Sequence, residues 1–201
     1  FMIRACFLVA LGAAEATKTV KIGILNPSTN NGGDVYAQSD LTGFFCPAFQ
    51  GICASNLAAR HINSKDPAVV TTIANLTANV SVELVHYNSE LEAQAGLQAF
   101  FTMVNVEKID AVITDMSYLT QFIAMVSDAG DHIPVCSNLA TAPALVVEGD
   151  FPYAALMRPT DTAAAHAMCN LIDSYGWASI GVVYRNYGDD EGYVAEIRSY
   201  V

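Results

Sequence analysis

Short apolar runs alternate with longer stretches of helical apolar spacing along most of the chain. The runs that predict strands are residues 20–25, 80–86, 111–113, 133–136 and 151–157. The stretches between them have the i, i+3, i+4 spacing of amphipathic helices, over residues 48–63, after Asn88-Ser89 and over residues 119–126. Because strands that alternate with helices form right-handed βαβ units, the pattern predicts an open, doubly wound α/β lobe with a parallel sheet.

The helical spacing also predicts which side chains face the core. In the first helix the inward positions are Phe49, Ile52, Cys53 and Leu57. Asn88 or Ser89 is expected to cap the helix after the second strand, because short polar side chains accept hydrogen bonds from free N–H groups at helix starts.

The same rhythm restarts after Pro159. Ala165, Met168, Cys169 and Ile172 form one face of a helix over residues 163–175, which is expected to end near Gly176. Residues 180–184 are a strand-like run, and Asn186-Tyr187-Gly188 predicts a turn before another helical pattern.

Composition narrows the class of protein. Hydrophobic residues make up 53% of the 201 residues, which is enough for a sizeable core. The formal net charge is −11, with 20 acidic against 9 basic residues and no basic run. This balance argues against nucleic acid and against an anionic membrane surface as partners, and it indicates an acidic, solvated exterior.

The amino terminus has the pattern of a secretory signal. Arg4 precedes an apolar run over residues 6–14, and Ala14-Glu15-Ala16 matches an A-x-A cleavage site. The run is shorter than the roughly 20 residues that a membrane-spanning helix needs. We therefore predict a signal peptide over residues 1–16 and, in keeping with export, glycosylation at the sequons of Asn75 and Asn79.

Four cysteines remain once the predicted signal is removed. Cys46 and Cys53 flank a short segment in which either a local disulfide or free thiols are compatible with an oxidising compartment. Cys136 in a strand and Cys169 on an apolar helical face are expected to be buried free thiols. No cysteine or histidine spacing matches a zinc site, and no metal or cofactor is predicted.

Ligands of open α/β sheets bind beyond the carboxyl ends of the strands, and this rule selects three loops. They are residues 114–117, residues 137–141 with Asn138, and residues 185–188. Two of these loops lead into helices whose free N–H groups and positive dipole end favour a carboxylate.

Several ordered motifs along the second half resemble one receptor family. They are IPVCSNLATAP, FPYAALMRPTD, a helix ending in YGW, the run IGVVY and the turn NYG. This order is similar to the extracellular ligand-binding region of class C G-protein-coupled receptors, natriuretic-peptide receptors and glutamate-receptor amino-terminal domains. The resemblance implies a two-lobed clamshell of the type I periplasmic-binding-protein fold, with lobe 1 over residues 17–158. Residues 159–201 would then be the hinge and an incomplete start of lobe 2.

The resemblance also implies roles for individual residues. Ser117 and Thr141 match positions that hold the α-carboxylate of an amino-acid ligand, Asp161 matches an acid that meets its ammonium, and Tyr187 matches an aromatic that covers it. Leu139 departs from the pattern, and the loop after the first strand has no basic residue for a distal carboxylate, which disfavours glutamate. Alternatively, Asp161 caps the following helix, Thr141 caps a turn, and Tyr187 only packs.

These observations lead to a non-enzymatic receptor hypothesis. None of the common catalytic or nucleotide-binding motifs is present. We expect the extracellular ligand-binding region of a membrane receptor, homodimeric through lobe 1, that closes on an amino-acid-like ligand and is anchored by segments downstream of residue 201. The alternatives are a secreted or periplasmic-type solute-binding protein of a transport system, and an interaction module whose cleft binds nothing.

Overall fold

The computed structural model describes residues 18–27, 46–65, 79–147, 149–184 and 188–200. Five parallel strands form one sheet in the order β2-β1-β3-β4-β5. They are β1 (Lys18–Asn26), β2 (Val80–Asn88), β3 (Ala111–Thr114), β4 (Val135–Ser137) and β5 (Ala154–Leu156). The strand order reverses between β1 and β3, so the predicted doubly wound α/β topology is confirmed, with its switch point beside β1.

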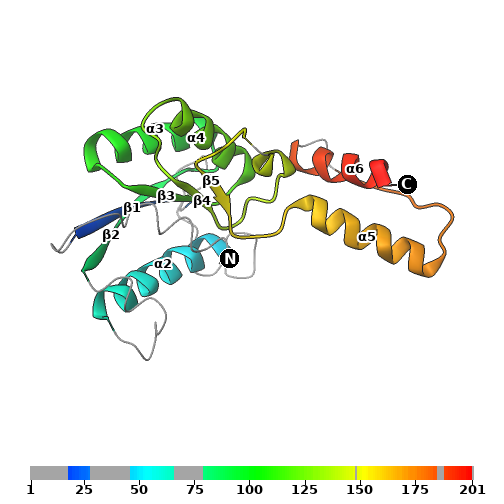
Figure 1. The fold of residues 1–201 in the computed structure, drawn as a ribbon, viewed down its shortest axis with the longest axis horizontal. Coiled ribbons are helices and arrows are strands. Elements are labelled where there is room, and N and C mark those ends of the chain that lie inside the picture. Colours follow the sequence, from blue (N-terminus) through cyan, green and yellow to red (C-terminus); the bar gives the residue numbers. More distant parts are fainter. Residues whose placement is uncertain (1–17, 28–45, 66–78, 148, 185–187, 201) are drawn as a thin grey trace.

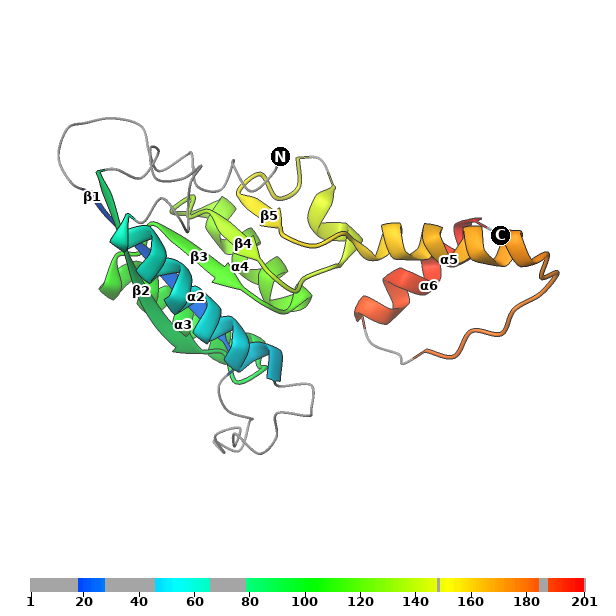
Figure 2. The same cartoon turned by 90° about the horizontal axis from the view of Figure 1, so that it is seen from below.

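Helices cover both faces of this sheet. Helix α2 (Cys46–Ser64) lies on one face, while α3 (Ala93–Thr102) and α4 (Ser117–Ala129) lie on the other (Figures 1 and 2). Alternate residues of β1 serve the two layers: Leu25 packs with α3 and α4, whereas Ile22 and Ile24 pack toward α2. Burial on both faces explains why β3 and the second half of β1 are continuous apolar runs. The edge strand β2, in contrast, contains Ser81, Glu83 and His86.

The face that α2 turns to the sheet differs from the predicted one. Cys53 and Leu57 are exposed, and Ala59 and Ile62 pack on the sheet instead. Two hydrogen bonds set this rotation: the Asn63 Nδ2 group donates to the Val82 carbonyl at 2.8 Å, and the Val82 N–H donates to Asn63 Oδ1 at 2.7 Å. The hydrogen bonds between Asn63 and the backbone of β2 therefore orient α2 more strongly than its weakly amphipathic sequence does.

Of the two alternatives for Cys46 and Cys53, the disulfide is not formed. Both cysteines belong to α2, and Cys53 is a free, exposed thiol. Seven residues of helix separate their Cα atoms by about 10 Å at 1.5 Å per residue, beyond the roughly 7 Å limit for a bridge. Cys169 is a buried free thiol, as predicted.

The start of α3 also differs from the prediction. Its N-cap is Glu92, whose side chain makes no capping hydrogen bond. Asn88 Oδ1 accepts a hydrogen bond from the Glu90 N–H, and Ser89 Oγ is buried without a hydrogen-bond partner. Glu90 and Leu91 have left-handed backbone conformations, so the chain turns once more between Ser89 and the helix.

Helices α5 (Asp161–Tyr175) and α6 (Gly188–Tyr200) pack on each other beyond the β5 edge of the sheet (Figures 1 and 2). Ala165, Cys169 and Ile197 form a small core between them, while Met168 is exposed, contrary to its predicted place. Helix α5 ends at Gly176 in the left-handed conformation, as predicted.

Residues 180–184 do not form the predicted strand. They have no regular structure, and Val183 is fully exposed. A strand is stabilised by its ladder partner, and no described segment pairs with this one.

Several predicted features of the amino-terminal half fall on or beside undescribed residues. The predicted signal peptide and Asn75 lie outside the described residues, whereas Asn79 is exposed in the turn before β2. Within the described residues, no helix combines the length and apolarity needed to cross a bilayer.

Close packing of α3 on α4 depends on Gly96. A Cβ at this position would lie 2.4 Å from Leu119 Cδ1, a buried side chain of the main core. We expect Gly96→Ala to lower the free energy of unfolding by about 1–3 kcal/mol, measured by urea denaturation. In the control Gly181→Ala, the added Cβ meets no atom within 4 Å, so stability should change by less than about 0.5 kcal/mol. Equal losses in both variants would contradict this packing.

Candidate functional site

Polar residues lie at or just after the carboxyl ends of the neighbouring strands β2, β1, β3 and β4, level with one another across the sheet. Asn26 of β1 pairs with Asn88 of β2. Ile24 pairs with Ile113, so Asp115 stands level with Asn26, two residues further along each chain. Thr114 pairs with Ser137, which places Asn138 level with Asp115. We call this set the polar row: Asn88, Asn26, Asp115 and Asn138.

The polar row faces α2. Residues in register in a parallel sheet point to the same face, and Ile24 and Ile113 of the preceding row pack toward α2. A Cβ on Gly51 of α2 would lie 3.1 Å from Asn26 Nδ2 and 3.7 Å from Asn138 Nδ2. The absence of a side chain at Gly51 therefore lets α2 lie directly against the polar row.

A second polar group gathers three of the predicted ligand residues, and we call it the hydroxyl–acid group: Ser117, Thr141 and Asp161. Ser117 Oγ accepts the N–H groups of Thr141 and Ala142 at 3.1 and 3.4 Å. The Thr141 hydroxyl donates to Asp161 Oδ2 at 3.1 Å, and the Asp161 N–H donates to the Thr141 carbonyl at 2.8 Å. The carboxyl end of β4 and the starts of α4 and α5 are thereby joined.

This geometry argues against the two capping alternatives. The N-cap of α5 is Thr160, so Asp161 is the first helical residue and its carboxylate takes the Thr141 hydroxyl instead of capping. The short 3₁₀ helix η3 (Pro143–Val146) begins after Ala142, and the Thr141 hydroxyl does not cap it. Tyr187 and its turn lie outside the described residues.

The start of α4 provides hydrogen-bond donors. Ser117 is its first residue, only 5% exposed, and Met116 at the N-cap makes no side-chain capping bond. Because a hydroxyl has one donor and two acceptor sites, Ser117 Oγ can still donate its proton after it accepts two backbone N–H groups. The first N–H groups of α4 and its positive dipole end add to this donor set, which suits an anionic group.

A buried hydroxyl cluster holds these loops in place. Ser137 Oγ lies 3.2 Å from Thr120 Oγ1 and donates toward the carbonyls of Thr114 and Asp115 at 3.2 and 3.1 Å. Thr114 and Thr120 hydroxyls lie 2.7 Å apart, and Ser137 Oγ also accepts the Ala140 N–H. These fully buried contacts fix the β3 and β4 loops relative to each other.

The structure adds Asp115, which the sequence reasoning missed. Its side chain is 1% exposed; Oδ1 accepts the Met116 N–H at 2.7 Å, and Oδ2 has no hydrogen-bond partner. Burial raises the pKa of this carboxyl to about 6, against the lowering effect of the Met116 N–H. An acid that directly follows a buried strand at the ligand-binding edge was the available signal. Asn138 Oδ1 is likewise buried without a partner.

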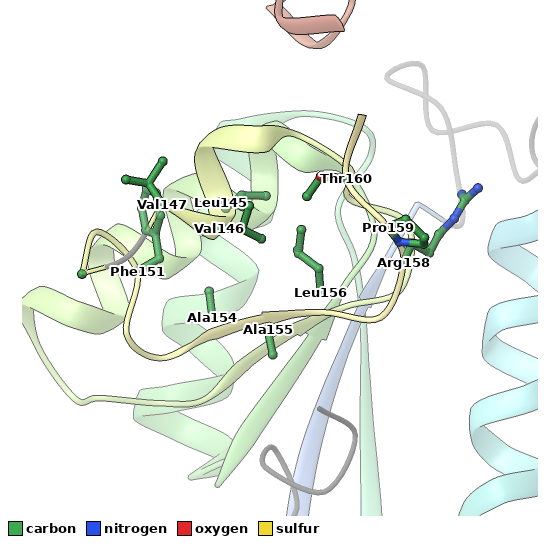
Figure 3. A pocket seen from close by; sticks show the side chains of 11 residues that line it. Leu145, Val146, Val147, Phe151, Ala154, Ala155, Leu156, Arg158, Pro159 and Thr160 are labelled. Atoms are coloured by element: carbon green, nitrogen blue, oxygen red, sulfur yellow. The ribbon is translucent and has the colours of Figure 1, made fainter. Parts of the chain in front are cut away.

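An apolar cavity of about 360 Å³ opens between η3 and β5 (Figure 3). Leu145, Val147, Leu156 and Thr160 are among its lining residues, whereas Arg158 extends away from the apolar side chains. None of the predicted ligand residues lines this cavity. Nor do the described residues contain a group of three acidic, histidine or cysteine side chains that could hold a metal ion.

The site therefore combines donors for an anion with an acid for a cation. Ser117 and the start of α4 supply the first, and Asp161, oriented by Thr141, supplies the second. This is the complementarity that a small zwitterion requires.

Two solved structures share this fold. Both are ABC transporter substrate-binding proteins from Desulfitobacterium hafniense, one of them in complex with Leu. They match at 17% and 19% sequence identity with TM-scores of 0.62 and 0.65, over 91% of this chain and 47% of theirs. The chain thus spans about half the length of these proteins. No curated protein matches it in sequence.

The sequence pattern of residues 53–198 matches the receptor family ligand-binding region, and this match covers well over half of the chain. The parallel sheet, its helical layers and the substrate-binding proteins of similar fold agree with that match. The chain belongs to the family of receptor ligand-binding regions, with the type I periplasmic-binding-protein-like fold.

Proposed function

We propose that this chain is the extracellular ligand-binding region of a membrane receptor and that it closes on a small, amino-acid-like ligand without catalysis. The hydroxyl–acid group supports the proposal best, because it brings a hydroxyl at the start of α4 and an acid at the start of α5 together at the carboxyl edge of the sheet. Neither the donors at the start of α4 nor the acid Asp161 would be informative alone, because helix starts and isolated acids are common on protein surfaces.

In this proposal the ligand α-carboxylate accepts the Ser117 hydroxyl and the first N–H groups of α4. The ligand ammonium meets Asp161, whose Oδ2 is already oriented by the Thr141 hydroxyl at 3.1 Å. Asn138 lies on the same edge and supplies a further amide. Preorganisation of these groups by backbone hydrogen bonds reduces the entropy lost on binding.

The remaining contacts would come from lobe 2. Residues 1–16 would be a signal peptide, residues 17–158 lobe 1, and residues 159–201 the hinge and the start of lobe 2, with Tyr187 covering the ligand ammonium. Closure would occur as a hinge motion near Arg158-Pro159, because contacts to both lobes favour the closed state. We further propose glycosylation at Asn75 and Asn79, a homodimer through lobe 1, and membrane attachment through segments downstream of residue 201.

A second candidate is a soluble solute-binding protein of a transport system. The two substrate-binding proteins of similar fold, one of them in complex with Leu, favour it. Sequencing the transcript beyond Val201 separates the two candidates. Membrane-spanning segments after lobe 2 would support the receptor, and a stop codon directly after lobe 2 would support the transport protein.

A free amino acid should stabilise the protein against heat. We expect L-leucine to raise the melting temperature with increasing concentration, since a ligand at 100 times its Kd adds about 2.7 kcal/mol. L-leucine methyl ester, which keeps the ammonium but has no carboxylate, should give little shift. Equal shifts from both compounds would contradict the anion site at Ser117. The absence of any shift from a panel of amino acids would favour the interaction-module alternative.

The contact between Thr141 and Asp161 should appear as coupled losses of affinity. Thr141→Val and Asp161→Asn should each weaken L-leucine binding at least tenfold, about 1.4 kcal/mol, by calorimetric titration. The double variant should lose less than the sum of the two, since the residues act through one hydrogen bond. Thr102→Val is the matched control, because the Thr102 hydroxyl donates within α3 to the Gln98 carbonyl. Unchanged affinity in both single variants would remove these residues from the site.

A further inference from the structure

Two neighbouring residues of the polar row, Asp115 and Asn138, each carry a buried acceptor oxygen. Asp115 and Asn138 are level on adjacent strands, on the face covered by α2, and the Asn138 N–H continues the ladder to the Thr114 carbonyl at 3.1 Å. Among the described residues, neither Asp115 Oδ2 nor Asn138 Oδ1 has a hydrogen-bond partner. Buried acceptors without donors are costly, so a proton between these two oxygens would satisfy both.

The neutral carboxylic acid supplies this proton. With Oδ2 protonated, Asp115 can donate to Asn138 Oδ1 while Oδ1 of Asp115 continues to accept the Met116 N–H. The ionised form has only acceptors to offer to the amide oxygen. Burial already raises the pKa of Asp115 to about 6, which brings the neutral form close to physiological pH.

Asp115 also lies two residues before the proposed anion site. Ser117 begins α4, and both Ser117 and Asp115 are buried. A ligand carboxylate at Ser117 and an ionised Asp115 would repel each other in surroundings that screen charge poorly. Binding of the anion therefore favours the neutral acid.

Other ionisable groups on the surrounding elements are placed elsewhere. His86 of β2 belongs to the preceding row and lies 3.3 Å from Asn56 Oδ1 of α2. Arg60 and His61 lie near the end of α2, where Asn63 bonds Val82, and the only acid of α4, Asp128, is in its last turn. Asp161 of α5 receives the Thr141 hydroxyl, and Arg158, exposed after β5, makes no ion pair with a described residue.

We propose that Asp115 is a proton-carrying positioning residue of the ligand site, which donates to Asn138 in its neutral form and takes up a proton when an anionic group binds at the start of α4. The proton uptake on anion binding rests on the proposed function. The hydrogen bond from neutral Asp115 to Asn138 concerns the unliganded protein alone. Asn138 would be held by this hydrogen bond, and ligand affinity would depend on pH through a residue that does not touch the ligand.

The unliganded protein tests the hydrogen bond from neutral Asp115 to Asn138. Carboxyl ¹³C NMR over pH 3–9, with the signal assigned by its loss in Asp115→Asn, should give a titration midpoint near 6. Urea denaturation should show Asp115→Asn gaining stability relative to wild type as pH rises through this range, because a raised folded pKa destabilises the ionised form. A midpoint at or below about 4 would mean an ionised carboxylate that accepts the amide of a reversed Asn138, and would overturn the proposal.

Calorimetric titration with L-leucine between pH 5 and 8 tests the proton uptake by Asp115 on ligand binding. Wild-type affinity should fall with rising pH above the unliganded midpoint, by up to about tenfold per pH unit, and Asp115→Asn should remove this dependence. Asp115→Leu, which keeps the size but has no donor, should bind weakly at every pH. A flat wild-type profile with intact binding overturns proton uptake. If no amino acid binds any variant, the proposed function fails, and the NMR midpoint still decides the state of Asp115.

Discussion

The in-register pairing of parallel strands is the constraint on which the site depends. Strands β1 and β2 end on Asn26 and Asn88, and β3 and β4 end one residue before Asp115 and Asn138. The register of the ladders places these four side chains level with one another. A slip of one residue in β3 would turn Asp115 to the opposite face and move Ser117 away from the loop after β4. The buried hydroxyls of Thr114, Thr120 and Ser137 oppose such a slip, because they hydrogen-bond only in this register.

Helix α2 packs closely on the polar row and covers its side chains. The Asn63–Val82 hydrogen bonds fix the helix at one end, and Gly51 lets its other half lie against Asn26 and Asn138. Within the polar row Asn26 and Asp115 are buried, whereas Asn88 and Asn138 are partly buried. Desolvation changes the acid–base behaviour of Asp115, so the packing of one helix influences the charge at the ligand-binding edge.

In the proposed function, the hydroxyl–acid group contacts the ligand, and the polar row contains the acid that responds to it. Thr141 and Asp161 orient each other, and the Ser117 oxygen accepts two backbone N–H groups, which leaves its hydroxyl able to donate to a ligand. The polar row lies behind this surface and carries the acid that responds to it. A site with its hydrogen bonds already formed loses little entropy when a small ligand arrives, which is how a binding domain without a large interface can be selective.

The sequence alone determined the fold class and most element positions, and it directed attention to the polar side chains at the carboxyl edge of the sheet. Apolar runs and helical spacing are local signals, and the rule for open sheets directs attention to the residues after each strand. Sequence reasoning failed where a distant partner decides the outcome. The rotation of α2 follows from Asn63 meeting Val82, and residues 180–184 lack a strand neighbour. The position of Asp115 directly after a buried strand was visible in the sequence, but its burial is a property of the tertiary packing.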